Sequence, residues 1–244
     1  MTESQRMSEN RGLWAVVPVK LFARTKQRLT PVLSRHECEA LARAMLEDVL
    51  FALTHTSSLA GVMVITGDAT AAAMAHAANA FVIADAENAG TTAAVTKAAQ
   101  HLAGMDGEGM LMVPADVPLI TTTDIEMIVA AHRAAPSITL VPAGIDGGTN
   151  ALACSPPGAV PFSFGDDSFR RHREAAWARG IEPKILRLER LGHDIDRPGD
   201  LETFLLRPSP THTYAYLAAN RVSERLRHAH QDRCYERRAG HTPR

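Results

Sequence analysis

Short apolar runs alternate with longer stretches of helical character over most of this chain, and this alternation limits the folds that it can adopt. Five runs have the length and apolar character of buried strands, namely 13–19, 61–66, 80–84, 109–115 and 137–143. The stretches between them that favour helices are 34–56, 69–79, 90–103 and 123–135. Strands that are joined through helices make right-handed crossovers between parallel neighbours. The pattern therefore predicts an α/β fold with a largely parallel sheet that is covered on both faces.

Several of the predicted helices begin with residues that cap a helix. Ser34 with Glu37, and Thr123 with Glu126, have the spacing of a capping box, in which side chains satisfy free backbone donors. Asp68 is placed to cap the alanine-rich helix that follows it. Later in the chain we expect a strand over 151–155, a helix over 167–180, a strand over 183–188 and a helix that opens at Pro198.

The composition changes at both ends of the chain. Residues 1–12 form a polar extension, and residues 13–208 contain the predicted elements, so we expect 13–208 to be the folded domain. A second extension over 209–244 is expected to form a short amphipathic helix over 214–228 and to be disordered over 229–244. Because this extension carries few apolar side chains, we expect a chain that is cut after residue 208 to fold and to work.

Charge and cysteine content narrow the class of protein. The formal net charge of -1 argues against a dedicated nucleic-acid binder, which usually carries a basic excess. No apolar run approaches the roughly 20 residues that cross a bilayer. The 3 cysteines lie far apart and form neither a disulfide framework nor a zinc site. We expect a cytoplasmic globular protein without a nucleic-acid or membrane partner, and a homodimer is compatible with the sequence.

A cluster of basic residues follows the first predicted strand and consists of Lys20, Arg24, Lys26 and Arg28. Open α/β sheets place their ligands at the carboxyl ends of the strands, and a cationic loop there would neutralise a triphosphate. The loop lacks the glycines of a Walker A motif or of a dinucleotide site. On charge count alone, a solvated loop without a ligand is the favoured alternative.

Three aspartates are candidates for a magnesium site. Asp116 directly follows a buried strand and stands between two prolines, and a carboxylate in this place commonly holds Mg²⁺. Asp194 and Asp196 alternate with Ile195, so in extended backbone both carboxylates point the same way and favour a cation between them. The alternatives are that Asp116 caps the next turn and that Asp196 caps the following helix.

Two further segments combine small and polar residues. In AGIDGGTNAL (143–152), the paired glycines let the backbone approach a ligand, and Thr149 adds a hydroxyl that suits a phosphate or a carboxylate. In PFSFGDDSFRRH (161–172), Gly165 and Ser168 stand at the start of a helix, whose free N–H groups attract anions. A simple hairpin turn is the alternative for the glycine pair.

In their order and spacing, these five segments resemble one protein family. VPVK with a downstream K-x-R-L, P-x-D-x-P-L, DGGTNAL, FG…SF and D-x-D-x-P look like the 2-phospho-L-lactate/phosphoenolpyruvate guanylyltransferase family over about residues 13–206. The resemblance implies a Rossmann-like three-layer sandwich of the nucleotide-diphospho-sugar transferase type. It also implies transfer of GMP from GTP to phosphoenolpyruvate, 2-phospho-L-lactate or 3-phospho-D-glycerate in coenzyme F-420 biosynthesis, where a downstream transferase takes the product.

The resemblance also implies a role for each candidate residue. Asp116, Asp194 and Asp196 would hold Mg²⁺ as the cofactor, and Asp116 and Lys20 are the catalytic candidates. The remaining roles are phospho-acid binding by Thr149, Gly165 and Ser168, and triphosphate binding by Lys20, Arg24, Lys26 and Arg28.

The expected base site departs from the family pattern. The family usually has G-L-N there, whereas this chain has Gly90-Thr91-Thr92, of which Gly90 and Thr92 are the candidates for nucleotide binding. Thr92 offers one hydroxyl where an asparagine offers both a donor and an acceptor. Two alternatives are a molybdenum-cofactor guanylyltransferase or a cytidylyltransferase of the same fold, but their glycine-rich first loop is absent. A non-catalytic nucleotide-binding protein is a third, against which the three retained aspartates argue.

Overall fold

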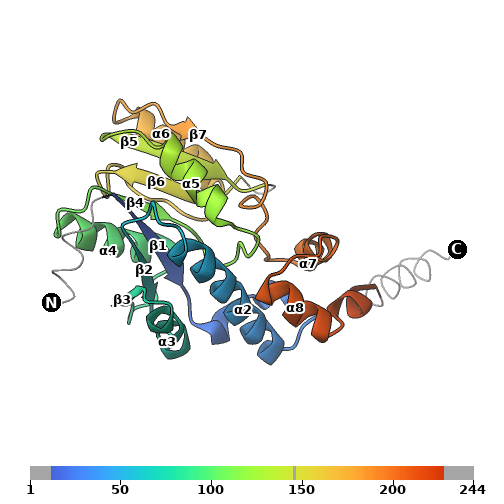
Figure 1. The fold of residues 1–244 in the computed structure, drawn as a ribbon. Coiled ribbons are helices and arrows are strands. Elements are labelled where there is room, and N and C mark those ends of the chain that lie inside the picture. The colour runs from blue at the N-terminus through green and yellow to red at the C-terminus, as the bar shows by residue number, and fades with distance from the viewer. Residues whose placement is uncertain (1–11, 145–146, 228–244) are drawn as a thin grey trace, which may run out of the picture.

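Seven strands form one sheet in a computed structural model that describes residues 12–144 and 147–227 (Figure 1). Their order across the sheet is β3-β2-β1-β4-β6-β5-β7. β6 runs antiparallel to β4 and β5, and the other neighbouring pairs are parallel, which confirms the predicted mostly parallel sheet. The strands are β1 (Leu13–Val19), β2 (Gly61–Thr66), β3 (Phe81–Ala84), β4 (Gly109–Met112), β5 (Ser137–Pro142), β6 (Thr149–Ser155) and β7 (Lys184–Ile185).

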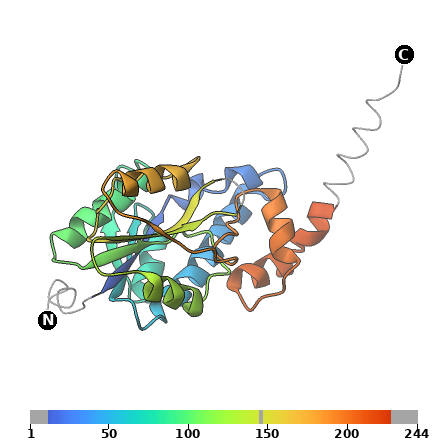
Figure 2. The same cartoon turned by 90° about the horizontal axis from the view of Figure 1, so that it is seen from above.

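Helices cover both faces of the sheet and complete the expected three layers (Figures 1 and 2). Side chains of β1 alternate between two hydrophobic cores, with Ala15 and Val17 in one and Trp14 and Val16 in the other. None of the helices in the described part of the chain has both the length and the apolar character of a membrane span. The first core is covered by α2 (Arg35–Thr54), α3 (Ala69–Ala77), α5 (Thr122–Ala131), α7 (Pro198–Leu205) and α8 (His212–Ala219), and the second by α4 (Thr91–Ala103) and α6 (Ser168–Trp177).

Three of the predicted helix starts are confirmed. At the start of α2, the Glu37 N–H donates to Ser34 Oγ at 3.3 Å, and the Ser34 N–H donates to the Glu37 carboxylate at 2.7 Å. At the start of α3, Asp68 accepts hydrogen bonds from two backbone N–H groups. Pro198 is the first residue of α7, as predicted.

The capping box that we predicted at Thr123 and Glu126 is wrong. The box at the start of α5 is formed by Thr121 and Asp124, two residues earlier. Both pairs have the required spacing, so local sequence alone does not separate them. A contact that is distant in sequence favours the observed one, because Arg190 Nε donates to the Asp124 carboxylate at 2.7 Å.

The segment beyond residue 208 packs on the domain. The expectation that its few apolar side chains would leave it undocked is therefore wrong. α8 packs against α2 (Figure 1). Leu217 and, from the helical residues 222–227, Val222 and Leu226 are buried in the same core as α2. The predicted amphipathic helix is thus present as two short helices. The expectations for residues 1–11 and 228–244 lie outside the described residues.

Candidate active site

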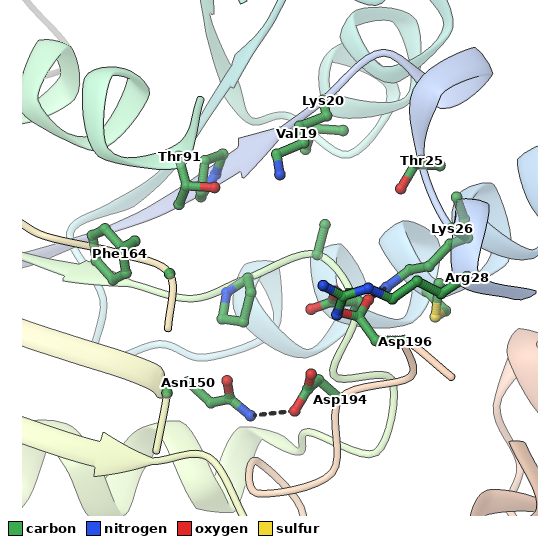
Figure 3. Close-up of a pocket in the computed structure, with 18 of the residues that line it drawn as sticks. Val19, Lys20, Thr25, Lys26, Arg28, Thr91, Asn150, Phe164, Asp194 and Asp196 are labelled. Carbon is green, nitrogen blue, oxygen red and sulfur yellow. Dashed lines mark hydrogen bonds and ion pairs between the residues drawn. The ribbon is translucent and has the colours of Figure 1, made fainter. Parts of the chain in front are cut away.

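A cleft of about 500 Å³ opens at one edge of the sheet (Figure 3). The parallel strands β1 and β4 reach this edge with their carboxyl ends, and the antiparallel β6 reaches it with its amino end, at Thr149. The reversed direction of β6 therefore brings its first residues beside the loops that follow β1 and β4. All five segments singled out from the sequence contribute lining residues, which fall mainly in 18–28, 112–116, 148–150, 164–168 and 194–196.

The basic loop after β1 forms one side of the cleft. Two short 3-10 helices, η1 (Phe22–Arg24) and η2 (Gln27–Leu29), shape this loop, and buried Phe22 and Leu29 anchor it in the core. The Phe22 N–H donates to the Asp68 carboxylate at 2.9 Å, which ties the loop to the start of α3. Three of the predicted basic side chains are exposed and line the cleft, namely Lys20, Arg24 and Arg28.

Lys26 differs from the other basic residues of the loop. Its side chain is only 4% exposed, and Nζ donates to Asp116 Oδ2 and to Asp196 Oδ1 at 2.7 Å each. Burial by itself would lower the pKa of Lys26, but the two carboxylates outweigh it and raise the pKa, so the side chain is a charged ammonium at neutral pH. The alternative of a solvated basic loop therefore fails for Lys26.

The two aspartates of the D-x-D motif have different surroundings (Figure 3). Both line the cleft while Ile195 between them is buried, as their alternation predicts. Asp194 Oδ1 accepts a hydrogen bond from Asn150 Nδ2 at 3.0 Å, and burial together with the nearby carboxylates raises the pKa of Asp194. Burial acts in the same direction on Asp196, but the Lys26 ammonium outweighs it and lowers the pKa of Asp196.

The contacts of the aspartates contradict the capping alternatives. The N-cap residue of α7 is Arg197, and Asp200 accepts hydrogen bonds from the N–H groups of Asp196 (2.9 Å) and Arg197 (2.7 Å). Asp196 thus contributes its backbone to the helix start, while its carboxylate binds Lys26. The Asp116 carboxylate likewise binds Lys26.

The three aspartates fit a magnesium ion that takes its other ligands from water and a bound phosphate. No group of three or more His, Cys, Asp or Glu side chains among the described residues is arranged to hold a metal ion by itself. Mg²⁺ usually takes one or two carboxylates and completes its shell with water and substrate phosphates. Asp116, Asp194 and Asp196 offer carboxylate oxygens around one cleft and meet this lower requirement.

The three candidates for phospho-acid binding, Thr149, Gly165 and Ser168, line the same cleft. The Ser168 hydroxyl donates to Thr149 Oγ1 at 3.3 Å. His172, which is fully buried, lies with Nδ1 3.0 Å from Thr149 Oγ1, and its Nε2 accepts a hydrogen bond from the Ser163 N–H at 3.0 Å. Burial, and then the charge of a neighbouring arginine, lowers the pKa of His172 to about 4, so the ring is neutral at pH 7.

The structure separates the two candidates for base binding. Gly90 is the N-cap residue of α4 and has a φ of 98°, a conformation that favours glycine, and it lines a small cavity beside Lys20. Thr92 is not among the residues that line this cavity or the cleft, whereas Thr91 lines both. The Thr92 hydroxyl instead accepts a hydrogen bond from the Phe164 N–H at 3.0 Å and so joins α4 to the loop before α6.

Two contributors to the site were not among the candidate residues. Asn150 directly follows Thr149 in the chain, but its partner, Asp194, lies 44 positions away and no local pattern joins them. His172 belongs to an Arg-Arg-His run that is typical of a solvated helix face. Its spacing from Ser168 could have identified it, because residues four apart share one face of a helix.

Known proteins and a known protein family are similar to this chain over most of its length. The chain matches a family model described as "Guanylyl transferase CofC like" over residues 13–238. A phosphoenolpyruvate guanylyltransferase from Roseiflexus castenholzii is 39% identical over 203 residues, which are 83% of this chain and 91% of the relative. A 3-phospho-D-glycerate guanylyltransferase from Colwellia psychrerythraea is 34% identical over 195 residues, 80% of this chain and 92% of the relative.

A solved structure supports the fold. The crystal structure described as a nucleotide-diphospho-sugar transferase from Desulfovibrio desulfuricans G20 superimposes with a TM-score of 0.73 at 18% identity, over 90% of this chain and 98% of that one. The fold type implied by the motifs is therefore confirmed. The family model spans most of the chain, and both relatives are covered over about nine tenths of their length. The chain belongs to the family of CofC-like guanylyltransferases.

Proposed function

We propose that this chain joins GMP from GTP to a small phosphorylated carboxylic acid in the cleft of Figure 3. An anionic oxygen of the acid's phosphate attacks the α-phosphorus of GTP. The bond from that phosphorus to the oxygen that bridges it to the β-phosphate breaks, and diphosphate leaves. The attacking oxygen is already anionic, so no general base is needed. The observation that carries the proposal is the meeting of a basic loop, three aspartates and a hydroxyl cluster in one cleft.

The exposed basic residues Lys20, Arg24 and Arg28 are proposed to bind the triphosphate and to stabilise the negative charge of the leaving diphosphate. Lys26 is buried beneath these three exposed side chains, and its ammonium is paired with the carboxylates of Asp116 and Asp196. Lys20 is the catalytic candidate among the four. It lines both the cleft and the small cavity at Gly90, and Gly90 stays the candidate residue for the base end of the nucleotide.

Asp116, Asp194 and Asp196 are proposed to hold magnesium together with phosphate oxygens. The bound ion would neutralise charge on the phosphates during transfer. The protein's own part is to hold the three carboxylates in place: Asn150 donates to Asp194, and the Lys26 ammonium donates to the other two.

Thr149, Gly165 and Ser168 are proposed to bind the phospho-acid. The two relatives are named for phosphoenolpyruvate and 3-phospho-D-glycerate, and each of these acids carries one phosphate and one carboxylate. 2-Phospho-L-lactate has the same two groups. The product would enter coenzyme F-420 biosynthesis and pass to a downstream transferase. A cytoplasmic location and a homodimer stay predictions from the sequence.

Diphosphate release tests the proposed function directly. The purified protein is incubated with Mg²⁺, one nucleotide (GTP, ATP, CTP or UTP) and one of the three acids, and the product is identified by mass spectrometry. We expect diphosphate release that requires an acid, with GTP as the best donor, and a product in which GMP is joined to the acid. Release with CTP or ATP while GTP is inert would reject guanylyl transfer, and no release with any acid would reject the acceptor class.

The position of Thr92 leads to a prediction about base selection. In Thr92→Val the Phe164 N–H loses its acceptor, which should loosen the loop that carries Gly165. We expect the KM for the acid to rise by roughly two- to tenfold, the worth of one hydrogen bond. The preference for GTP over ATP should stay unchanged, because Thr92 does not line the cleft. A collapse of that preference with an unchanged KM for the acid would show that Thr92 reads the base, as the sequence suggested.

A further inference from the structure

A buried histidine connects the parts of the proposed phospho-acid site. His172 lies in α6, four residues after Ser168, and is completely buried. Its ring contacts the Phe164 ring edge-on, with centroids 4.8 Å apart. One ring nitrogen faces the Ser163 N–H and the other faces the Thr149 hydroxyl, at 3.0 Å each. The imidazole therefore touches both the loop before α6 and the first residue of β6.

The hydrogen-bond partners determine which ring nitrogen carries the proton. A backbone N–H can only donate, so Nε2 of His172 is the acceptor of the Ser163 N–H and carries no proton. A neutral ring has its one proton on the other nitrogen, and burial keeps this ring neutral at pH 7. Nδ1–H therefore donates to Thr149 Oγ1.

This arrangement determines what the Thr149 hydroxyl can do. Its oxygen accepts one hydrogen bond from His172 and a second from the Ser168 hydroxyl. A hydroxyl has two acceptor positions and one proton, so with both positions taken Thr149 acts toward a ligand as a donor. Thr149 lines the cleft, and a donor whose direction is fixed in advance binds an anionic oxygen without the cost of reorientation.

We propose that His172 is a positioning residue, which fixes the Thr149 hydroxyl as a hydrogen-bond donor to an anionic oxygen of the acceptor acid. The proposal rests on the proposed function, which places the acid at Thr149. His172 does not touch the acid and takes no part in group transfer. Its second bond, to the Ser163 N–H, holds the loop that leads to Gly165 and is separable from the first.

Two substitutions separate the two bonds. In His172→Gln, the side-chain end lies near the position of Nε2 and can still accept from Ser163, but the donor to Thr149 is lost. In His172→Asn, the amide nitrogen lies near the position of Nδ1 and can still donate to Thr149, while the acceptor for Ser163 is lost. We expect the KM for the acid to rise about tenfold or more in His172→Gln. In His172→Asn it should rise less, only by the amount that loosening the loop before Gly165 costs, as in Thr92→Val. The KM for GTP should stay unchanged in both variants.

The chain offers a matched control in His132. It is a partly buried histidine, and both of its ring nitrogens are hydrogen-bonded too, to the hydroxyls of Thr139 at 3.0 Å and Ser155 at 3.1 Å. Ser155 ends β6, whereas Thr149 begins it, so His132 lies at the edge of the sheet away from the cleft. His132→Gln should lower the melting temperature as His172→Gln does and leave both KM values unchanged. An equal rise in the KM for the acid in the two variants would show that the effect of His172→Gln comes from lost stability alone, and it would overturn the proposal.

Thr149→Val distinguishes failure of this proposal from failure of the proposed function. We expect Thr149→Val to raise the KM for the acid, and His172→Gln to add little when Thr149 is already valine, because both changes remove one interaction. If Thr149→Val raises the KM and His172→Gln does not, the positioning role is wrong and the acid site stands. If Thr149→Val has no effect, the acid does not bind at Thr149, and both the proposed acid site and the positioning role of His172 are wrong.

The tautomer of His172 can be measured in the unaltered protein, which removes the dependence on the folding of variants. Nitrogen-15 NMR of histidine-labelled protein distinguishes a protonated Nδ1 from a protonated Nε2. We expect the Nδ1–H form at pH 7, and Thr149→Val should shift that signal while leaving the His132 signal in place. A proton on Nε2 would overturn the proposal, since Nδ1 would then accept from Thr149 and take away its donor.

Discussion

Replacing Asp116 with asparagine is expected to lower kcat at least about a hundredfold while the protein stays folded. Asp116 lies in the cleft beyond β4, with its carboxylate 2.7 Å from Lys26 Nζ, and is a proposed magnesium ligand. An amide carries no charge and binds Mg²⁺ poorly. Loss of one preorganised electrostatic contact in an active site commonly costs about 10²–10³ in kcat. Lys26 keeps its bond to Asp196, so the buried ammonium is not left without a partner.

Asp124→Asn is the matched control for this measurement. Asp124 is also a carboxylate paired with a cation, since Arg190 Nε donates to it at 2.7 Å, and it is 3% exposed, but it does not line the cleft. Its asparagine variant should lose thermal stability and keep its kcat. Steady-state rates at saturating GTP, acid and Mg²⁺, with melting curves for both variants, make the comparison. A kcat for Asp116→Asn within about tenfold of the unaltered protein would remove Asp116 from the mechanism.

The layers of the fold could be predicted from the sequence because they depend on patterns that repeat along the chain. Apolar runs of strand length, separated by capped helices, lead to a mostly parallel sheet without knowledge of any single contact. Helix boundaries depend on individual contacts, which local sequence does not determine. The pairs Thr121/Asp124 and Thr123/Glu126 have the same spacing, and the ion pair from Arg190, 66 positions away, distinguishes them only in the folded chain.

Most of the candidate residues that line the cleft could be predicted from the sequence, but the contacts between them could not. Strand ends of an α/β sheet meet at one edge, so the order of the predicted strands and helices is enough to place the residues that follow β1 and β4 together. Lys26 looked like its exposed basic neighbours, and its burial between Asp116 and Asp196 becomes visible only when segments 90 and 170 positions away are in place. His172 was overlooked for the same reason, because its partners are set by β6 and by the preceding loop.

Cutting the chain after residue 208 is expected to destabilise it strongly, which reverses the expectation from composition. The removed segment supplies four hydrogen bonds to the Asp48 carboxylate, from the backbone and side chains of His212 and Thr213, at 2.6–3.1 Å. The Asp48 side chain is only 6% exposed. Hydrogen bonds to a charged group contribute about 1.5–3 kcal/mol each, so the loss of this set is expected to cost at least about 3–5 kcal/mol. The loss of buried Leu217, Val222 and Leu226 adds to that cost.

The expected shift is large enough to measure by calorimetry. A loss of about 3–5 kcal/mol lowers the melting temperature of a chain of this size by roughly 6–20 °C. A chain cut after Arg227 is the matched control, because it keeps every contact just described and should melt close to the full chain. Thr213→Val tests the Asp48 contribution without truncation, since it removes the 2.6 Å bond from Thr213 Oγ1 and preserves the shape of the side chain. If the chains cut after 208 and after 227 melt at the same temperature, the packing of α8 contributes nothing to stability, and the boundary at residue 208 describes a self-sufficient domain after all.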